Sequence, residues 1–358
     1  MWVQIMNEFN KITFRKSLID WYLEEKRNLP WRETNDPYKI WVSEIMLQQT
    51  RVDTVIPYYN RFIDIFPTME DLANANEEKL LKQWEGLGYY SRARNLQAGV
   101  REVVETYNSI VPTTRNEISS LKGVGPYTAG AILSIAYGKP EHAVDGNVMR
   151  VLSRVLLIKE DIAKPKTRKT FELAVTEIID SQDPSSFNQG LMELGAVICT
   201  PTSPKCLLCP VRDNCTAYYV GEQNNLPVKT KNKKTKAMHY DIYVVQNDKK
   251  QFLMEKRAEK GLLANMYQFP MIELATKEAD TIPLLDNRYG IHFTKEIDLG
   301  PFKHVFSHLT WEMNCFVGRS TEDSLLETCK WLTIEEIKEV PMPVPMLKIW
   351  QAYIERGN

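Results

Sequence analysis

The sequence of 358 residues has no uninterrupted apolar run near the roughly 20 residues that a membrane-spanning helix needs. It also has almost no net charge, because 45 basic and 46 acidic residues give a formal value of -1. The segment from Met1 to Lys16 lacks the apolar core of a cleavable signal peptide. These absences predict a cytoplasmic protein with no membrane partner. Any binding of a polyanion must then come from local basic surface.

Cysteine is scarce, but four of the six cysteines stand at C-x6-C-x2-C-x5-C spacing: Cys199, Cys206, Cys209 and Cys215. A compact set of four thiolates can hold a [4Fe-4S] cluster. Zinc is the alternative, although structural zinc sites usually pair two short C-x2-4-C knuckles and only Cys206 and Cys209 form one. Disulfides are disfavoured without a secretory signal. We therefore favour a cluster loop at 199–215 and treat Cys315 and Cys329 as ordinary thiols.

Composition divides the chain into three parts. Residues 1–220 have helical apolar periodicity interrupted by Gly, Pro and Asn. Residues 221–237 have few apolar side chains and five lysines, which is typical of a linker: Lys229, Lys231, Lys233, Lys234 and Lys236. Residues 238–358 contain strand-like runs at 240–245, 252–255 and 304–317, then two helical segments at 334–339 and 346–354. The predicted fold is multidomain, an all-α domain followed by an α+β domain.

A glycine-containing turn at about residues 116–137 has the form of a helix-hairpin-helix. Its central sequence, L-K-G-V-G-P-Y-T-A-G, begins at Leu121. The two glycines permit a tight turn with positive φ, and Pro126 suits the first turn of a helix. Backbone N–H groups at that helix start can hold a phosphate. The expected DNA-backbone contacts are Lys122, Gly123, Val124 and Gly125, and the alternative is a plain turn between packed helices.

The cysteine intervals and this hairpin resemble the endonuclease III superfamily of DNA glycosylases. In that superfamily, enzymes that also cleave the DNA strand carry a nucleophilic lysine at the position of Tyr127. A phenol cannot form a Schiff base with the sugar. The resemblance therefore implies hydrolytic removal of a base without strand cleavage.

Two carboxylates suit such a reaction, which needs protonation of the leaving base and support for a positive sugar. Asp145 precedes the helical run 148–156, so we expect it to cap a helix and to favour its ionised form. Glu44 has apolar neighbours in I-W-V-S-E-I-M-L, so burial in a pocket would raise its pKa and make it a general acid. The alternatives are capping alone for Asp145 and a structural ion pair with an arginine for Glu44.

Three further segments are similar to the MutY-type adenine DNA glycosylases: Pro30–Arg32, Trp41–Thr50 and Trp84–Tyr90. The resemblance extends from about Trp21 to Trp331. It implies repair of double-stranded DNA by removal of adenine mispaired with 8-oxoguanine or guanine, after the adenine is flipped into a pocket. On this resemblance Glu44 protonates adenine at N7, Asp145 supports the sugar cation or bonds to it transiently, and Tyr127 and Asn147 position the acid and the intermediate. The implied base contacts are Trp31, Arg32 and Gln189 around the adenine, and Gln49, Thr50, Leu87 and Tyr89 around the 8-oxoguanine.

Lys256–Pro270 resembles the opening of a Nudix-type domain, but the G-x5-E-x7-R-E-x2-E-E box of Nudix hydrolases does not follow it. We expect this domain to recognise the lesion. In the adenine glycosylases an F-S-H turn in this region contacts 8-oxoguanine, which implies that role for Phe306, Ser307 and His308. Ser307 can supply both a donor and an acceptor. An ordinary β-turn is the alternative for so short a motif.

Three other functions remain open. A bifunctional glycosylase and lyase for oxidised pyrimidines is disfavoured by Tyr127, and a nucleotide phosphohydrolase by the missing Nudix box. A DNA-binding protein without catalysis would use the same hairpin and cysteine loop. We expect a monomer that associates with the nucleoid of a bacterial-type cell when it binds DNA. We expect the cluster to be structural, with Lys205 and Arg212 facing phosphates.

Overall fold

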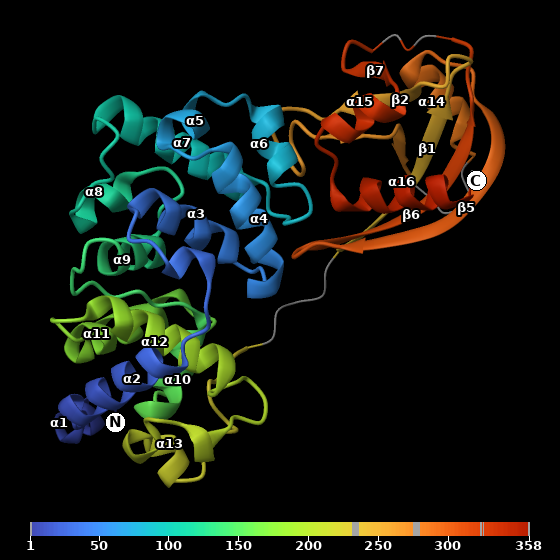
Figure 1. Cartoon of the computed structure of the whole chain (residues 1–358). Helices are drawn as coiled ribbons and strands as arrows, with labels where there is room; N and C mark the ends of the chain where they lie inside the picture. Colours follow the sequence, from blue (N-terminus) through green and yellow to red (C-terminus); the bar gives the residue numbers. More distant parts are fainter. Residues whose placement is uncertain (1, 231–235, 275–279, 323, 325, 357–358) are drawn as a thin grey trace. The chain divides into compact units, whose positions relative to one another are not determined.

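The computed structural model describes residues 2–230, 236–274, 280–322, 324 and 326–356 (Figure 1). Lys231, Lys233 and Lys234 of the predicted linker lie outside these residues. The chain forms two compact units. The helical unit comprises Met1–Asn74 and Asn95–Lys231, and the mixed unit comprises Ala75–Arg94 and Asn232–Asn358. Within the described ranges, no helix has the length and apolar character to cross a membrane.

The helical unit is built from helices and short turns, as the sequence pattern predicts. Its α-helices are α1 (Trp2–Glu8), α2 (Lys11–Glu25), α3 (Pro37–Leu47), α4 (Val52–Ile65), α5 (Met69–Asn74), α7 (Ser91–Thr106, from residue 95 onward), α8 (Arg115–Ser120), α9 (Pro126–Ile135), α10 (Gly146–Val155), α11 (Pro165–Ile178), α12 (Pro184–Val197) and α13 (Thr216–Tyr219). Among the described residues of this unit, three 3-10 helices accompany them: η1 (Pro30–Arg32), η2 (Cys206–Leu208) and η3 (Arg212–Asn214). Side chains of Asn10, Asp36 and Asp183 accept backbone N–H groups at the starts of α2, α3 and α12, which stabilises these ends.

One apolar core holds α2, α10, α11 and α12 together. It includes Phe14 of α2, Val151 of α10, Phe171 of α11 and Leu191 of α12, all fully buried. Val144, which precedes the predicted site residue Asp145, belongs to the same core. Three cysteines of the cysteine loop pack against its edge. The start of α10 and the cysteine loop therefore share one rigid support.

The first part of the predicted linker packs against the helical unit. Arg154 donates from Nε to the carbonyl of Leu226 at 3.0 Å, and the Leu226 side chain is buried. The N–H of Ile162 donates to the carbonyl of Val228 at 3.0 Å. Thr230 donates its N–H to Asp161 at 3.2 Å. Residues 226–230 are thus held in place despite their linker-like composition.

The mixed unit confirms the predicted strands at 240–245 and 252–255 and the two closing helices, whereas a turn at 306–308 divides the predicted run 304–317 between two strands. Its elements are α6 (Glu77–Gln83), β1 (Lys236–Gln246), β2 (Phe252–Lys256), β3 (Tyr267–Gln268), β4 (Met271–Glu273), α14 (Ile282–Tyr289), β5 (Thr294–Val305), β6 (Leu309–Arg319), β7 (Cys329–Leu332), α15 (Ile334–Glu339) and α16 (Val344–Arg356). The strands form one sheet of order β3-β2-β1-β6-β5, with β4 paired to β1 and β7 paired to β2. β1 and β6 are parallel, and β5 and β6 form an antiparallel hairpin.

Helices cover both faces of this sheet. Neighbouring residues of a strand point to opposite faces. Leu253 of β2 packs in one buried cluster with Leu285 of α14, whereas the ring of the adjacent Phe252 meets Trp350 of α16 at 4.9 Å. Residues 75–94 join the unit through polar contacts that include Lys256 with Glu78 at 2.6 Å.

Candidate active site

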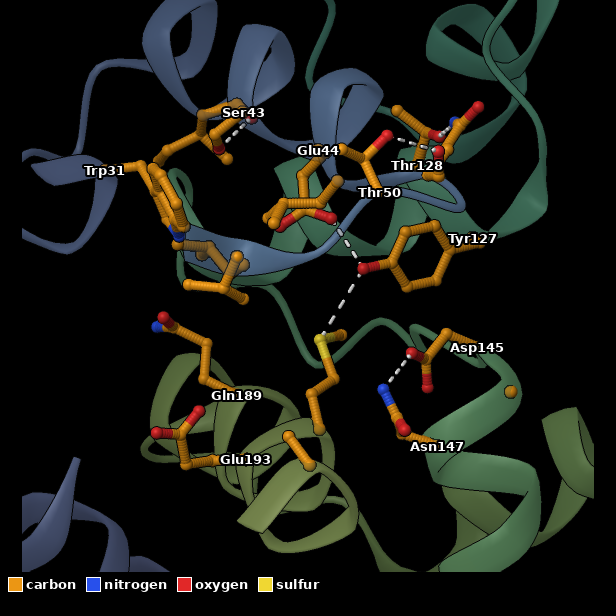
Figure 2. Close-up of a pocket in the computed structure, with 18 of the residues that line it drawn as sticks. Trp31, Ser43, Glu44, Thr50, Tyr127, Thr128, Asp145, Asn147, Gln189 and Glu193 are labelled. Carbon is orange, nitrogen blue, oxygen red and sulfur yellow. Dashed lines mark hydrogen bonds between the residues drawn. The ribbon is translucent and has the colours of Figure 1, made fainter. Parts of the chain in front are cut away.

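A cavity of about 690 Å³ opens in the helical unit among α3, α9, α10 and α12 (Figure 2). Most of the site residues predicted within this unit line it: Trp31, Arg32, Glu44, Gln49, Thr50, Gly123, Gly125, Tyr127, Asp145, Asn147 and Gln189. Lys122 and Val124 do not line this cavity. Lys122 is exposed to solvent, and Val124 is buried. Segments more than 100 positions apart in the sequence thus converge on one space.

Glu44 is a carboxylic acid inside an apolar helix. α3 begins after the capping residue Asp36 and buries most of its side chains, including Glu44, which is 5% exposed. Burial raises the pKa of Glu44 to about 7, partly opposed by a hydrogen bond from Tyr127 and reinforced by the nearby Asp145. The predicted burial is confirmed. The partner is a phenol rather than an arginine, because Tyr127 donates from Oη to Glu44 Oε2 at 2.5 Å.

Asp145 caps α10, as predicted. Its Oδ1 accepts the N–H of Val148 at 2.7 Å, and its Oδ2 accepts Nδ2 of Asn147 at 2.9 Å. Desolvation nevertheless raises the pKa of Asp145 above its ordinary value, although both hydrogen bonds favour the ionised form. Burial thus opposes the ionised form that the capping hydrogen bonds favour, and the predicted cap itself is confirmed.

Tyr127 lies on the first turn of α9, directly after Pro126 at the first helical position. Its hydroxyl points toward Glu44 (Figure 2) and also lies 3.6 Å from Sδ of Met192. Burial and the two neighbouring carboxyl groups raise the pKa of Tyr127 well above its ordinary value. The phenol is therefore a neutral hydrogen-bond donor at every physiological pH.

One local expectation about the turns near this cavity is wrong. Gly123 has the predicted positive φ of 80°, but Gly125 has φ of -91° and needs no left-handed backbone. α3 ends at Leu47, and Gln49 lies in an exposed turn with φ of 57°. The start of α9 has no side-chain cap, so no side chain at its N-cap accepts from its first N–H groups.

Glu193 of α12 is a cavity residue that sequence reasoning missed. It is 1% exposed and accepts from Nε of Arg27 at 2.7 Å and from Nη2 of Arg32 at 2.8 Å. Desolvation opposes ionisation, but the two arginine hydrogen bonds lower the pKa of Glu193 to about 2. The charge of the predicted contact Arg32 is thus paired inside the protein. The available signal was an acidic residue within the apolar stretch 191–198, the same signal that singled out Glu44.

The other two predicted adenine contacts form part of the cavity wall. Trp31 is buried in η1, and its ring meets that of Tyr59 edge to face at 5.4 Å. Gln189 lines the cavity from α12 and donates from Nε2 to Oγ of Ser185 at 3.1 Å. The wall therefore offers an aromatic surface and an amide to a bound ring.

The remaining predicted recognition residues belong to the mixed unit. Leu87 is buried, and Tyr89 is 45% exposed with φ of 48°. Arg92 donates from Nη2 to the carbonyls of Leu87 and Gly88 at 3.1 and 3.0 Å, and its guanidinium carbon lies 5.6 Å from the centroid of the Tyr89 ring. This arginine holds the loop in its left-handed turn.

Phe306, Ser307 and His308 form the tip of the hairpin between β5 and β6. The N–H of Phe306 donates to the carbonyl of Leu309 at 2.8 Å, which closes the turn. Ser307 and His308 are exposed, and Ser307 Oγ lies 3.2 Å from His308 Nδ1. The tip therefore presents polar side chains to solvent.

The four clustered cysteines line one small cavity beside α10. Nη1 of Arg154 donates to Sγ of Cys199 at 3.1 Å, and backbone N–H groups donate to Cys209 and Cys215. Among the residues that the structure describes, no three Cys, His, Asp or Glu side chains are already arranged to hold a metal ion. The four cysteines nevertheless line one cavity and have N–H donors to sulfur, so the kind of ligand that they supply fits a thiolate-ligated cluster.

Comparisons with known proteins agree with this architecture. Residues 42–177 match the HhH-GPD superfamily base excision DNA repair protein, and residues 242–352 match the NUDIX domain. The chain is 35% identical to the adenine DNA glycosylase of Rattus norvegicus, over 96% of this chain and 78% of that protein. It is 34% identical to that of Homo sapiens, over 95% and 74%, and 34% identical to that of Buchnera aphidicola subsp. Schizaphis graminum, over 95% and 98%. The solved structure of a thermostable thymine-DNA glycosylase is 29% identical with a TM-score of 0.53, over 59% of this chain and 97% of that one.

Proposed function

Because the chain belongs to the adenine DNA glycosylases of base-excision repair, we propose that it hydrolyses the N-glycosidic bond of adenine mispaired with 8-oxoguanine, and also with guanine. One observation carries the proposal. Glu44, with its pKa raised to about 7, and Asp145 line the same cavity as Tyr127. An acid and a carboxylate that converge on one space suit the cleavage of a bond between a sugar and a base.

Glu44 supplies the proton. The mispaired adenine is flipped into the cavity, and Trp31, Arg32 and Gln189 contact it there. A pKa of about 7 leaves a substantial fraction of Glu44 protonated at neutral pH. Tyr127 occupies Oε2 and holds the carboxyl group in one orientation, so the proton is carried on Oε1 toward N7 of adenine.

Asp145 supports the sugar once the bond to the base breaks. The electron pair of that bond leaves with the protonated adenine, and positive charge develops at the anomeric carbon. The Asp145 carboxylate, held by Val148 and Asn147, stabilises this charge or bonds to it transiently. Nη2 of Arg150 donates to Oδ1 of Asn147 at 2.7 Å and keeps that amide in position. Water then completes the hydrolysis.

The reaction stops at base removal. Strand cleavage by β-elimination needs an amine that forms a Schiff base with the sugar, and the cavity has Tyr127 at the matching position. Lys122 is exposed on the hairpin, where a phosphate contact suits it better than catalysis. Gly123, Val124 and Gly125 add backbone contacts to the same phosphate.

The remaining recognition residues are assigned to the 8-oxoguanine and to the gap in the duplex. Gln49, Thr50, Leu87 and Tyr89 surround the 8-oxoguanine, with Gln49 or Tyr89 filling the gap that the extruded adenine leaves. The hairpin tip Phe306–His308 reads the damaged base edge through hydrogen bonds from Ser307. In this assignment residues 1–220 form the glycosylase domain, 221–237 the basic linker and 238–358 the lesion-recognition domain of a monomer.

Four residues of the glycosylase domain would hold a [4Fe-4S] cluster: Cys199, Cys206, Cys209 and Cys215. When bound, such a cluster supplies a structural cross-link for the loop 199–215. Lys205 and Arg212 on that loop then face DNA phosphates.

A strand assay tests the proposed function. Duplexes that carry adenine opposite 8-oxoguanine, adenine opposite guanine, or thymine glycol are incubated with the protein, with and without alkali afterwards. We expect alkali-dependent breaks at adenine in the first two duplexes and none in the third. Breaks without alkali would identify a lyase, and breaks at thymine glycol would identify a pyrimidine glycosylase. Binding without any break would identify a non-catalytic DNA-binding protein.

A further inference from the structure

The segment that presents Asp145 is held mainly by side chains of surrounding helices. Residues 138–145, between α9 and α10, have no regular secondary structure. Three of the carbonyl groups near the end of this segment accept hydrogen bonds from three different helices. The pairs are Asn188 Nδ2 with Glu141 O at 2.8 Å, Arg115 Nη2 with His142 O at 2.9 Å, and Arg168 Nη2 with Val144 O at 2.5 Å.

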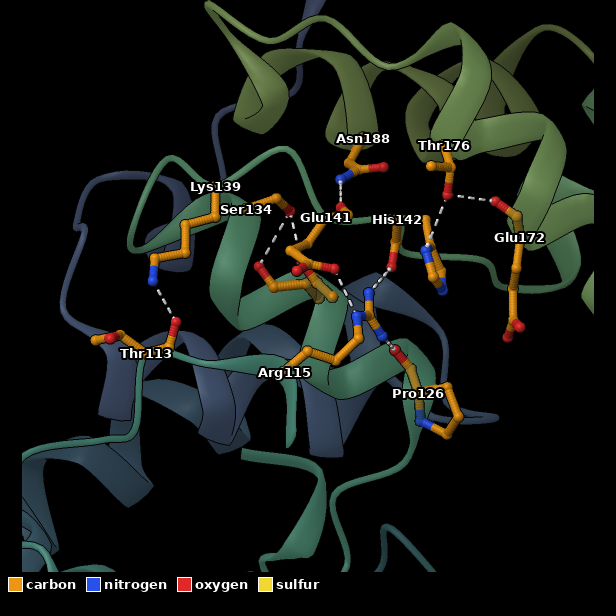
Figure 3. Close-up of polar contacts among 12 residues, drawn as sticks. Thr113, Arg115, Pro126, Ser134, Lys139, Glu141, His142, Glu172, Thr176 and Asn188 are labelled. Carbon is orange, nitrogen blue, oxygen red and sulfur yellow. Dashed lines mark hydrogen bonds and ion pairs between the residues drawn. The ribbon is translucent and has the colours of Figure 1, made fainter. Parts of the chain in front are cut away.

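Arg115 makes the most connections among these donors (Figure 3). Besides the carbonyl of His142, its Nη1 donates to the carbonyl of Pro126 at 3.1 Å and its Nε pairs with Oε2 of Glu141 at 2.5 Å. Pro126 immediately precedes Tyr127, and His142 lies three residues before Asp145. One rigid guanidinium therefore joins the backbone beside Tyr127 to the backbone that leads to Asp145.

Close packing against α9 fixes the same point from the other side. A Cβ atom at Gly130 of α9 would lie 1.8 Å from the carbonyl oxygen of His142 and 3.0 Å from Nη2 of Arg115. The segment therefore rests directly on the α9 backbone, where only glycine leaves room. Arg115 closes over this contact from α8, the first helix of the hairpin.

On the basis of the proposed function, we propose that Arg115 is a positioning residue for base release. It keeps Asp145 at a set distance from the pair formed by Tyr127 and Glu44, through the carbonyls of His142 and Pro126. It touches neither base nor sugar in this role. A displacement of about 1 Å in a reacting group can lower a rate about 100-fold, so loss of the clamp is expected to slow base release about 10- to 100-fold.

The test compares three variants of the full chain. Arg115→Met removes every hydrogen bond of the guanidinium, and Arg115→Lys retains the charge but cannot reach both carbonyls in the same geometry. Arg15→Met is the matched control. Arg15 also donates to two backbone carbonyls, those of Ile178 at 2.7 Å and Glu177 at 3.5 Å, but it does not line the cavity.

Three quantities are measured for each protein: the thermal unfolding midpoint, the affinity for a duplex with adenine opposite 8-oxoguanine, and the single-turnover rate of adenine release. The rate is measured at a temperature well below the unfolding midpoint of every variant. We expect Arg115→Met to release adenine more slowly with unchanged affinity, Arg115→Lys to be intermediate, and Arg15→Met to react at the wild-type rate. If Arg115→Met does not fold, slower adenine release by Arg115→Lys than by the wild type supports the proposal instead.

The inference is overturned if Arg115→Met releases adenine at the wild-type rate. If Arg115→Met does not fold, release at the wild-type rate by Arg115→Lys overturns it. Equal slowing in the Arg15 variant also overturns it, since that result indicates a general loss of rigidity. A wild-type protein that releases no adenine is a different result, because it rejects the proposed function itself.

Discussion

Glu44→Gln is expected to remove catalysis and at the same time stabilise the protein at alkaline pH. The carboxyl group of Glu44 is buried, and its pKa is raised from 4.5 to about 7. A raised pKa in the folded state means that the contribution of Glu44 to stability is fully present below its unfolded pKa. That contribution is lost as the pH rises through the folded pKa. Glutamine is neutral at every pH, so the variant does not undergo this loss.

The size of the effect follows from the displacement of the pKa. One pKa unit corresponds to about 1.4 kcal/mol, so a change from 4.5 to about 7 corresponds to at most about 3 kcal/mol in the free energy of unfolding. The amide oxygen of glutamine can still accept the hydrogen bond from Tyr127, which limits other losses. For a unit of this size, about 3 kcal/mol corresponds to a rise of roughly 6–12 °C in the unfolding midpoint.

The assay compares the unfolding midpoints of wild type and variant at pH 5 and pH 8. The difference between the two proteins is the measured quantity, because the titration of groups that do not interact with Glu44 cancels. Glu193→Gln is the control: its carboxylate has a pKa lowered to about 2, so its contribution is complete above pH 4.5 and the variant should be destabilised equally at both pH values. The unfolding midpoint of Glu44→Gln should rise relative to that of the wild type between pH 5 and pH 8. The absence of this rise would falsify the assigned burial of a neutral acid.

Three further predictions concern activity. Glu44→Gln and Asp145→Asn should each abolish adenine release while they leave mispair binding largely intact, and full activity in single-turnover assays rejects the corresponding role. Tyr127→Phe removes a hydrogen bond that lowers the pKa of Glu44. The alkaline limb of the pH-rate profile should therefore move to higher pH, while the maximal rate falls. An alkaline limb that does not move, or that moves to lower pH, contradicts the assigned hydrogen bond. Ser307→Ala should lose the preference for 8-oxoguanine over guanine opposite adenine, and unchanged discrimination in competition assays argues against lesion reading at the hairpin tip.

Features of the fold that depend on residues close together in the sequence were predictable. The side chain of Asp145 and the ring of Pro126 act on the first turns of their own helices, so their positions in the sequence indicated where α10 and α9 begin. The β-branched and aromatic runs of the second half likewise indicated β1, β2 and β6. Contacts between distant segments were not predictable in this way. Neither the grouping of residues 75–94 with the mixed unit nor the docking of Leu226 on Arg154 leaves a local signal.

The site shows the same division between local and distant causes. The apolar neighbours of Glu44 predicted its burial, since they occupy the same helix. Its shared cavity with Asp145 depends on how α3 and α10 pack, and only the family resemblance indicated it. The backbone of Gly125 was misjudged because two glycines in one turn need not both be left-handed. The cap formed by Asp145 was predictable from its place before α10, whereas the burial that opposes its ionisation was not, because burial depends on how the whole unit packs.

Glu44 and Glu193 explain why burial alone cannot assign a role to a carboxyl group. Both lie within apolar helices, both line one cavity and both are almost inaccessible to solvent. The hydrogen-bond partner of Glu44 is a neutral phenol, so desolvation prevails and the proton is retained near pH 7. The partners of Glu193 are two guanidinium groups, so the charge is retained down to about pH 2. A group that must release a proton at neutral pH can therefore be Glu44 but not Glu193, and the partner rather than the degree of burial decides which of the two can act as the acid.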